Sequence, residues 1–198
     1  MSDTYKTIIT PTEGIYKEKG SKFLSFAIPV SSADEVKEIV KNYRKEYYDS
    51  RHVCYAYMLG AERKEFRAND DGEPSGTAGR PILGQINSRE LTNILVIVVR
   101  YFGGILLGTG GLVAAYKEAT TDALDQAEVI EKTVDESISI LFDYVLMNEV
   151  MRIIKDTNAL ISSQSFEDQC AMQLSIRKQD AGLLSAKLAK IYGLQIKE

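Results

Sequence analysis

Three stretches of the chain carry residue types that can do chemistry. The first is Arg51-His52-Val53-Cys54-Tyr55-Ala56. Side chains alternate along a β-strand, so His52 and Cys54 would point to the same face, where such a pair could bind a metal ion or activate a thiolate. His52 is the only histidine in the sequence, so a multi-histidine metal site is excluded. The favoured interpretation is a hydrogen-bonded histidine beside a buried cysteine.

The second stretch runs from residue 69 to residue 79 and is the most irregular part of the sequence. Its candidate site residues are Asp70, Asp71, Gly72, Glu73, Pro74, Ser75, Gly76, Thr77 and Gly79. The three carboxylates could hold a cation or act as general acid and base. The backbone amides of Gly76, Thr77 and Gly79 could instead form an anion-binding nest. A rigid turn held by Asx and Ser/Thr capping bonds is the structural alternative.

The third stretch is a buried strand that enters a glycine-rich loop and then a helix. Its candidate site residues are Arg100, Tyr101, Phe102, Gly103, Gly104, Gly108, Gly110 and Gly111. Amides at a helix N-terminus attract phosphate or carboxylate, and glycine lets such a ligand approach closely. No Gly-Lys-Ser/Thr follows, so the loop is not a Walker A motif. Glycines that allow tight packing between strand and helix are the alternative.

Hydrophobic periodicity predicts the elements that must position these stretches. Strands are expected over residues 14–30 with a turn at 19–21, and over 53–59, 65–68 and 93–102. A helix is expected to begin at Ser32, where Glu35 completes a capping-box pattern, and a second helix over residues 112–128.

The hydrophobic pattern restarts near Thr133. Six further elements follow in the order β-α-β-β-α-β, which is the order of a ferredoxin-like unit. We therefore expect an α/β (α+β) protein with one domain over residues 1–133 and a ferredoxin-like domain over residues 134–198. Glu131 and Lys132 are expected in a short linker between them.

The 198 residues are 44% hydrophobic and 26% charged, which is typical of a globular protein with a packed core. The formal net charge of -4 argues against a protein that coats nucleic acid through bulk electrostatics. One early stretch is nevertheless rich in bases: Lys17, Lys19, Lys22, Lys37, Lys41, Arg44 and Lys45. Acids are interleaved with them, so a solvated helix face of mixed charge is the favoured interpretation.

Cysteine usage and hydropathy indicate the compartment. Cys54 and Cys170 are too few for a disulfide framework, which favours a reducing compartment and hence the cytoplasm. The longest apolar run, residues 94–99, is too short to span a bilayer, and no secretory signal is recognisable. No membrane partner is expected.

Taken together, the three stretches resemble the signatures of the YigZ/IMPACT family, in the same order. Lys19-Gly20-Ser21-Lys22-Phe23 near the start also matches. The resemblance covers the whole chain, because bacterial members carry a second small domain after the Impact domain. It implies that the first domain is similar in fold to the second domain of a small-subunit ribosomal protein and to domain IV of elongation factor G. The second domain would resemble domain V of that factor.

The resemblance also implies a theme of translation, with RNA, the ribosome or a translation factor as partner. We therefore expect a binding protein of this kind rather than an enzyme, with no cofactor and no metal. Some family members carry a proline-dipeptidase label, but this chain shows no histidine-carboxylate metal set to support it. The alternative is an enzyme or a nucleotide- or phosphate-binding protein that uses the cleft between the acidic loop and the glycine-rich loop; the small-molecule ligand stays unknown.

These interpretations make one geometric prediction. Unusual loop chemistry at separated positions tends to converge on one site, so residues 70–79 are expected beside residues 103–111, with His52 and Arg100 close by. An anion is expected at the amides that open the helix near Gly110, assisted by nearby bases. Arg80, Arg100 and Lys117 are the nearest candidates, and Arg100 could otherwise pair with Asp70 or Asp71.

Overall fold

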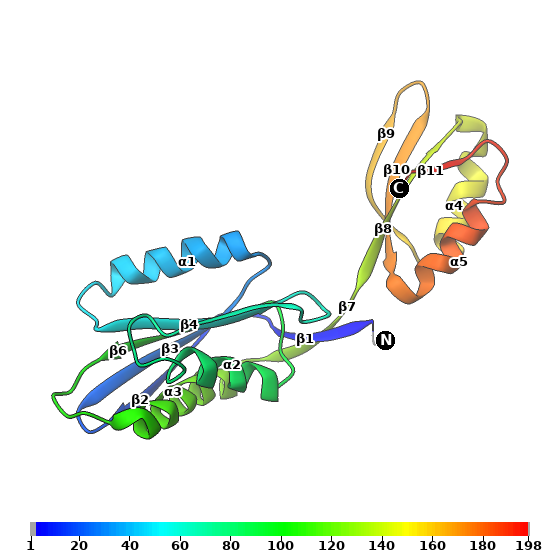
Figure 1. Cartoon of the computed structure of the whole chain (residues 1–198). Coiled ribbons are helices and arrows are strands. Elements are labelled where there is room, and N and C mark those ends of the chain that lie inside the picture. Colours follow the sequence, from blue (N-terminus) through cyan, green and yellow to red (C-terminus); the bar gives the residue numbers. More distant parts are fainter. Residues whose placement is uncertain (1–2, 198) are drawn as a thin grey trace. The chain divides into compact units, whose positions relative to one another are not determined.

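The computed structural model describes residues 3–197 and shows a mixed α/β protein (Figure 1). Within these residues the chain forms five α-helices and eleven strands. Contacts divide it into two compact units: one comprises residues 5–132, and the other comprises residues 3–4 with 133–197. Each unit has its own hydrophobic core.

A five-stranded antiparallel sheet forms the framework of the first unit. Its order is β2 (Thr12–Glu18), β3 (Ser21–Pro29), β6 (Ile94–Tyr101), β4 (His52–Leu59) and β5 (Glu65–Asn69). The central strand β6 is fully buried from Ile94 to Val99. A strand covered on both faces has no solvent side, which explains its unbroken apolar sequence. The predicted strands of this region are confirmed.

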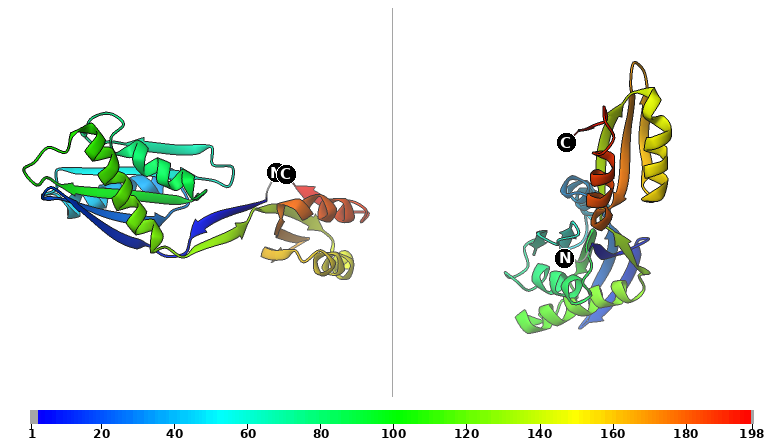
Figure 2. Two further views of the ribbon diagram at one scale, coloured as in Figure 1. Left: turned by 90° about the horizontal axis from the view of Figure 1, so that it is seen from below. Right: turned by 90° about the vertical axis from the view of Figure 1, so that its right-hand side faces the viewer.

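Helices cover both faces of this sheet (Figures 1 and 2). On one face lies α1 (Ala33–Glu46), which buries Val36 and Val40 against Leu95 and other side chains of β4 and β6. On the opposite face lie α2 (Gly79–Ser88) and α3 (Gly108–Asp125). The predicted start of α1 is confirmed, because the Ser32 side chain accepts a hydrogen bond from the Glu35 amide at 3.2 Å.

Three features of the first unit differ from the sequence prediction. Helix α2 follows directly on the acidic loop and was not predicted. Helix α3 begins at Gly108, four residues before the predicted start, because the low helix propensity of glycine hides its first turn from a sequence pattern. Glu131 and Lys132 lie in a strand, β7 (Val129–Thr133), which pairs with β1 (Thr4–Ile8), and not in a linker. Both strands are too short for hydrophobic periodicity to reveal them.

The second unit has the predicted order β-α-β-β-α-β. Its elements are β8 (Asp135–Phe142), a 3-10 turn η1 (Tyr144–Leu146), α4 (Met147–Asp156), β9 (Leu160–Phe166), β10 (Cys170–Arg177), α5 (Lys178–Leu188) and β11 (Gln195–Lys197). The sheet order is β11-β8-β10-β9, and α4 and α5 lie side by side on one face (Figures 1 and 2). The assignment of this unit as a ferredoxin-like domain over 134–198 stays a prediction.

Candidate functional site

The register between β4 and β6 places the first two candidate residues side by side. His52 at the start of β4 is paired with Arg100 near the end of β6. Cross-strand partners share a face of the sheet, and side chains alternate along each strand. Cys54 and Val98, two residues further along, belong to the core beneath α2 and α3. His52 and Arg100 therefore face the same side, at the end of the sheet where the loops gather.

Asp70 organises the acidic loop through backbone amides. Its carboxylate accepts hydrogen bonds from the amides of Gly76, Ala78 and Gly79 at 2.8, 3.0 and 2.8 Å. Burial raises the pKa of this carboxyl, but the three amide bonds outweigh burial and hold the pKa below its ordinary value. Asp70 thus stabilises the start of α2, and the anion-binding nest considered from the sequence is already occupied by this side chain.

Asp71 joins the loop to the sheet and to α1. Its carboxylate accepts from the Val53 amide at 2.7 Å and from Arg44 at 2.6 Å. The Asp71 carbonyl oxygen lies 2.7 Å from Nδ1 of His52, and a carbonyl only accepts, so Nδ1 carries a proton. With Asp70 and Asp71 bound in this way, the interpretation of the loop as a cation site or an acid-base pair loses two of its three carboxylates. Within residues 3–197 no cluster of three His, Cys, Asp or Glu could hold a metal ion.

Glu73 is the carboxylate that reaches the interior. Its Oε1 accepts from Arg100 Nη1 at 2.6 Å and from the Tyr116 hydroxyl at 2.9 Å. Arg100 therefore pairs with Glu73, and the sequence expectation of a pair with Asp70 or Asp71 is wrong. Both side chains are almost fully buried, with 6% of Arg100 and 3% of Glu73 exposed. The second oxygen, Oε2, lies 3.8 Å from Nε2 of His52.

The Arg100 guanidinium has one buried nitrogen, Nε, without a hydrogen-bond partner among the described residues. Its carbon lies 5.5 Å from the ring centre of Phe23 and 5.7 Å from that of Phe102, so aromatic faces stabilise the cation. Nε is buried, and no atom of the described chain accepts its hydrogen bond. A buried donor without an acceptor is costly, so this N–H favours a ligand oxygen in the adjoining space.

Cys54 lies in the core next to the site and contacts two of its residues. Its thiol donates to the Asp70 carbonyl at 3.0 Å and contacts the Tyr116 hydroxyl at 3.3 Å. Burial raises the pKa of this thiol far above its ordinary value, so it stays protonated and weakly nucleophilic. The thiolate role considered for His52 and Cys54 is therefore not supported. Burial raises the pKa of Tyr116 as well.

The glycines of the third stretch fall into two groups. A side chain at Gly103 would lie 1.9 Å from the backbone of Gly20, so Gly103 allows the β2-β3 turn to approach. By contrast, Gly108 and Gly110 in the first turn of α3 have open space where a side chain would be. No side-chain cap and no first-turn acid satisfies the amides there among the described residues. The helix therefore presents bare N–H groups and the positive end of its dipole.

These elements enclose a cavity of about 490 Å³ in the first unit. Its lining residues are Arg51, His52, Glu73, Pro74, Arg100, Phe102, Leu106, Leu107, Gly108, Thr109 and Leu112. The lining thus combines apolar side chains with two arginines, a histidine, the Glu73 carboxylate and the opening turn of α3. We call this cavity the α3 pocket.

The α3 pocket takes in some predicted site residues and leaves others out. His52, Glu73, Pro74, Arg100, Phe102 and Gly108 line it. Cys54, Asp70, Asp71, Gly72, Ser75, Gly76, Thr77, Gly79, Arg80, Tyr101, Gly103, Gly104, Gly110 and Gly111 are not among its lining residues. Two residues of the second group hold neighbouring segments in place: Asp70 orders the acidic loop, and Gly103 allows the β2-β3 turn to approach. Neither Arg80 nor Lys117 lines the pocket.

Five lining residues were missing from the predicted set: Arg51, Leu106, Leu107, Thr109 and Leu112. All five stand inside or beside the motifs already singled out. Arg51 takes the place expected for Arg80 and Lys117, because its amide is held by the Arg100 carbonyl at 2.9 Å. The signal that could have found it was its position next to His52 at the start of a strand.

Comparison with known proteins gives consistent matches. Residues 19–124 match the Impact N-terminal domain. The IMPACT family member YigZ of Escherichia coli is 32% identical over 181 residues, which are 90% of this chain and 89% of that protein. The IMPACT family member YvyE of Bacillus subtilis is 28% identical over 96% of this chain and 88% of that protein. A crystal structure described as that of a hypothetical protein superposes with a TM-score of 0.77, with 30% identity over 99% of this chain and 97% of the other.

Proposed function

The chain belongs to the IMPACT family, and from that membership we propose that it is a translation-linked regulatory protein that works by binding RNA in the α3 pocket. The translation theme comes from the family resemblance. RNA as the partner comes from the chemistry of the pocket. We place this function in the cytoplasm, because Cys54 and Cys170 are both free thiols, as in a reducing compartment. None of the helices within residues 3–197 has the length and hydropathy of a membrane span.

The observation that carries the proposal is the buried Arg100 guanidinium beside the uncapped start of α3. A phosphate group would supply an acceptor for the open N–H groups of Arg100 and of the α3 amides. Arg51 is exposed at the same pocket and adds a second cation. The apolar wall of Phe102, Leu106 and Leu107 suits the flat face of a base.

The overall charge of -4 decides how the RNA would be held. This net charge argues against RNA binding through the bulk electrostatics of the whole surface. Binding through one pocket with preformed donors needs only a few phosphate contacts. The salt dependence should then be shallow, near 0.7 in log-log slope for each phosphate contacted on a single strand.

The direct test is a titration of a labelled single-stranded RNA of about 12 nucleotides by fluorescence anisotropy at low salt. Arg51→Ala should weaken binding severalfold, because it removes a cation at the pocket without touching the Glu73–Arg100 pair. Arg152→Ala is the matched control, since it removes the same charge from an exposed position in the other unit. Equal affinity of both variants and the wild type would contradict the proposal.

A second candidate is a protein that binds a free nucleotide in the same pocket. The observation in its favour is the volume of about 490 Å³, which lies in the range of small-molecule sites. Calorimetry with free mononucleotides separates the two candidates. Binding of a mononucleotide as tight as that of the 12-nucleotide RNA would favour the second.

A further inference from the structure

A second cavity lies on the opposite face of the five-stranded sheet, along α1. It has a volume of about 370 Å³ and is lined by Lys37, Val40, Lys41, Arg44, Lys45 and Tyr55. We call it the α1 groove. Four of its six lining residues are cations, and none is a carboxylate.

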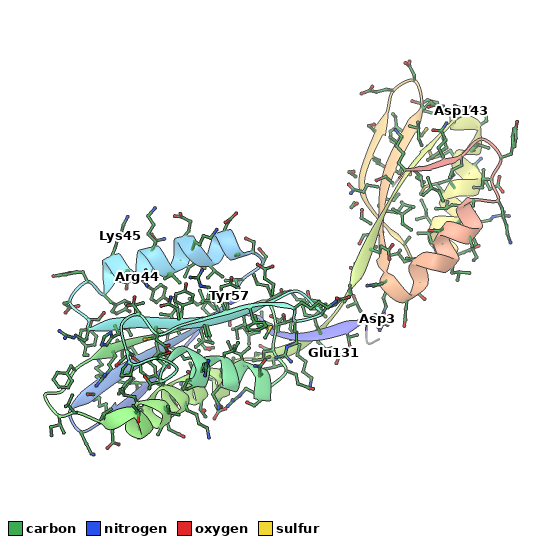
Figure 3. The ribbon with its side chains drawn as sticks, in the orientation of Figure 1. Asp3, Arg44, Lys45, Tyr57, Glu131 and Asp143 are labelled. Carbon is green, nitrogen blue, oxygen red and sulfur yellow. The ribbon has the colours of Figure 1, made fainter. Side chains whose placement is uncertain are left out.

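Helical spacing gathers these cations. Positions 37, 41, 44 and 45 recur every three or four residues, so they form one stripe beside the buried Val36 and Val40. Figure 3 shows Arg44 and Lys45 at the C-terminal end of α1. The sheet adds a further cation to the same face. Arg67 on the edge strand β5 is paired with Tyr57, and Tyr57 packs in the core under α1.

Three of the four cations of this stripe have a carboxylate partner. Lys37 pairs with Asp34 at 2.7 Å and Lys41 with Glu38 at 3.7 Å, and these partners are 90% and 70% exposed. Arg44 pairs with Asp71 at 2.6 Å, whose side chain is 27% exposed. Ion pairs between exposed side chains are weak and are screened by salt. Within residues 3–197 no ion pair joins Lys45 to a carboxylate.

Asp71 contacts one lining residue of the α1 groove and one of the α3 pocket. Arg44 lines the groove and binds the Asp71 carboxylate at 2.6 Å. His52 lines the pocket and binds the Asp71 carbonyl at 2.7 Å. A polymer that leaves the pocket past Asp71 would therefore meet Arg44 first and then the lysines of α1.

We infer that the α1 groove takes the phosphodiester backbone of the RNA strand whose nucleotide occupies the α3 pocket. The inference rests on the proposed function of the pocket and extends it from one nucleotide to a short single strand. Lys37 to Lys45 cover about 12 Å of helix, at 1.5 Å per residue. Tyr55 offers a ring among the cations, as in grooves that track single-stranded nucleic acid.

Charge and shape favour RNA over the other anionic occupants. An anionic membrane would need apolar side chains on the outward face of α1, and among the described residues of α1 no large apolar side chain is exposed. An acidic protein segment would satisfy the lysines but would leave the half-buried Tyr55 ring without a specific role. The groove also opens beside a pocket with its own phosphate chemistry.

The experiment compares a 12-nucleotide RNA with a 5′-phosphorylated dinucleotide, each titrated into three variants of the full chain. Lys41→Ala/Lys45→Ala removes two exposed cations of the groove. Lys155→Ala/Lys190→Ala removes the same charge from exposed positions in the other unit. Arg51→Ala reports on the pocket. Circular dichroism confirms that each variant is folded.

The groove variant is expected to bind the 12-nucleotide RNA about tenfold more weakly, with a log-log salt slope lower by about 1.4, for two lost phosphate contacts. Its affinity for the dinucleotide should equal that of the control. Arg51→Ala should weaken both ligands. If the groove variant binds the longer RNA as tightly as the control, the inference is wrong while RNA binding in the pocket stands.

Two other outcomes are equally decisive. If the groove variant loses affinity for the longer RNA while Arg51→Ala binds both ligands normally, the groove contact holds and the proposed pocket function falls. If the wild type binds neither RNA at low salt, both fall.

Discussion

The two units of the chain build their sheets from similar strands but cover them differently. In residues 5–132 helices lie on both faces, so the five-stranded sheet offers ligands little besides its ends. In residues 133–197 helices cover one face, and the other presents small polar side chains such as Ser139, Ser163 and Gln173. The five-stranded sheet, which is covered on both faces, is the one that has buried charges, strained loops and the uncapped N-terminus of α3 at one end. The two units therefore differ more in the chemistry of the residues at their sheets than in the strands that form those sheets.

The largest expected effect is on the buried Glu73–Arg100 ion pair of the first unit. Glu73→Ala leaves Arg100 buried without its partner and should lower the free energy of unfolding of that unit by about 3–5 kcal/mol. Glu136→Ala, at an exposed glutamate of the second unit, should cost less than about 0.5 kcal/mol. Chemical denaturation followed by circular dichroism measures both. Similar losses in the two variants would show that the pair is not the stabilising contact.

A contrast between two glycines tests whether packing and binding use different residues. Gly103→Ala places a methyl group against Gly20 and should destabilise the first unit by about 1–3 kcal/mol. Gly110→Ala meets open space and should stabilise α3 by about 0.5–1 kcal/mol, because alanine favours helix. The same methyl group should weaken RNA binding, because it hinders approach to the amides. Thermal melts and RNA titrations of both variants check this, and unchanged RNA affinity in Gly110→Ala would count against the amide site.

The next effect is the loss of the Asp70 cap. Asp70→Ala should destabilise the first unit by about 1–2 kcal/mol, because three amides lose their acceptor. The pKa of Asp70 in the folded state lies below its ordinary value of 3.8. Its contribution to stability is therefore complete above pH 3.8 and is lost as the pH falls through the folded pKa. The gap in unfolding free energy between wild type and variant should be largest at pH 7, shrink below pH 3.8 and close once the pH is below the folded pKa; a gap that stays constant would contradict this assignment.

The smallest effect is expected on the open face of the second sheet. Ser163→Ala and Ser165→Ala remove exposed hydroxyl groups and should change the unfolding free energy by less than about 0.5 kcal/mol. RNA affinity should be unchanged, because neither serine carries a charge and the proposed RNA contacts lie in the first unit. A loss of affinity here would move the RNA site to the second unit.

The sequence predicted the framework of the site better than its contacts. Hydrophobic period two on β4 and the apolar run of β6 were sufficient to place His52 and Arg100 on strands, since these patterns follow from burial. The start of α3 was missed because a glycine-rich segment has low helix propensity and carries no apolar period that would reveal its first turn. The hydrogen bonds from the amides near the start of α2 to Asp70 could not be predicted either. Apart from this distant side chain, α2 has no recognisable N-terminal signal in the sequence.

The choice among partners of Arg100 also lay beyond the sequence. Asp70, Asp71 and Glu73 were all within reach along one flexible loop, and each could have paired with it. The positive φ of Asp71 and Gly72 turns the chain so that Glu73 points inward. Backbone conformation of this kind depends on many weak contacts and is not encoded in one residue pattern.

The most direct test of the account is a nuclear magnetic resonance titration of the wild-type chain with a short single-stranded RNA. The account predicts saturable shifts of the amides of Gly108, Thr109 and Gly110. It also predicts a shift of the Arg100 Nε–H, which has no acceptor among residues 3–197. Resonances of residues 133–197 should move little. Shifts confined to those residues, with the Arg100 Nε–H unchanged at saturation, would contradict the claim that the α3 pocket binds the RNA.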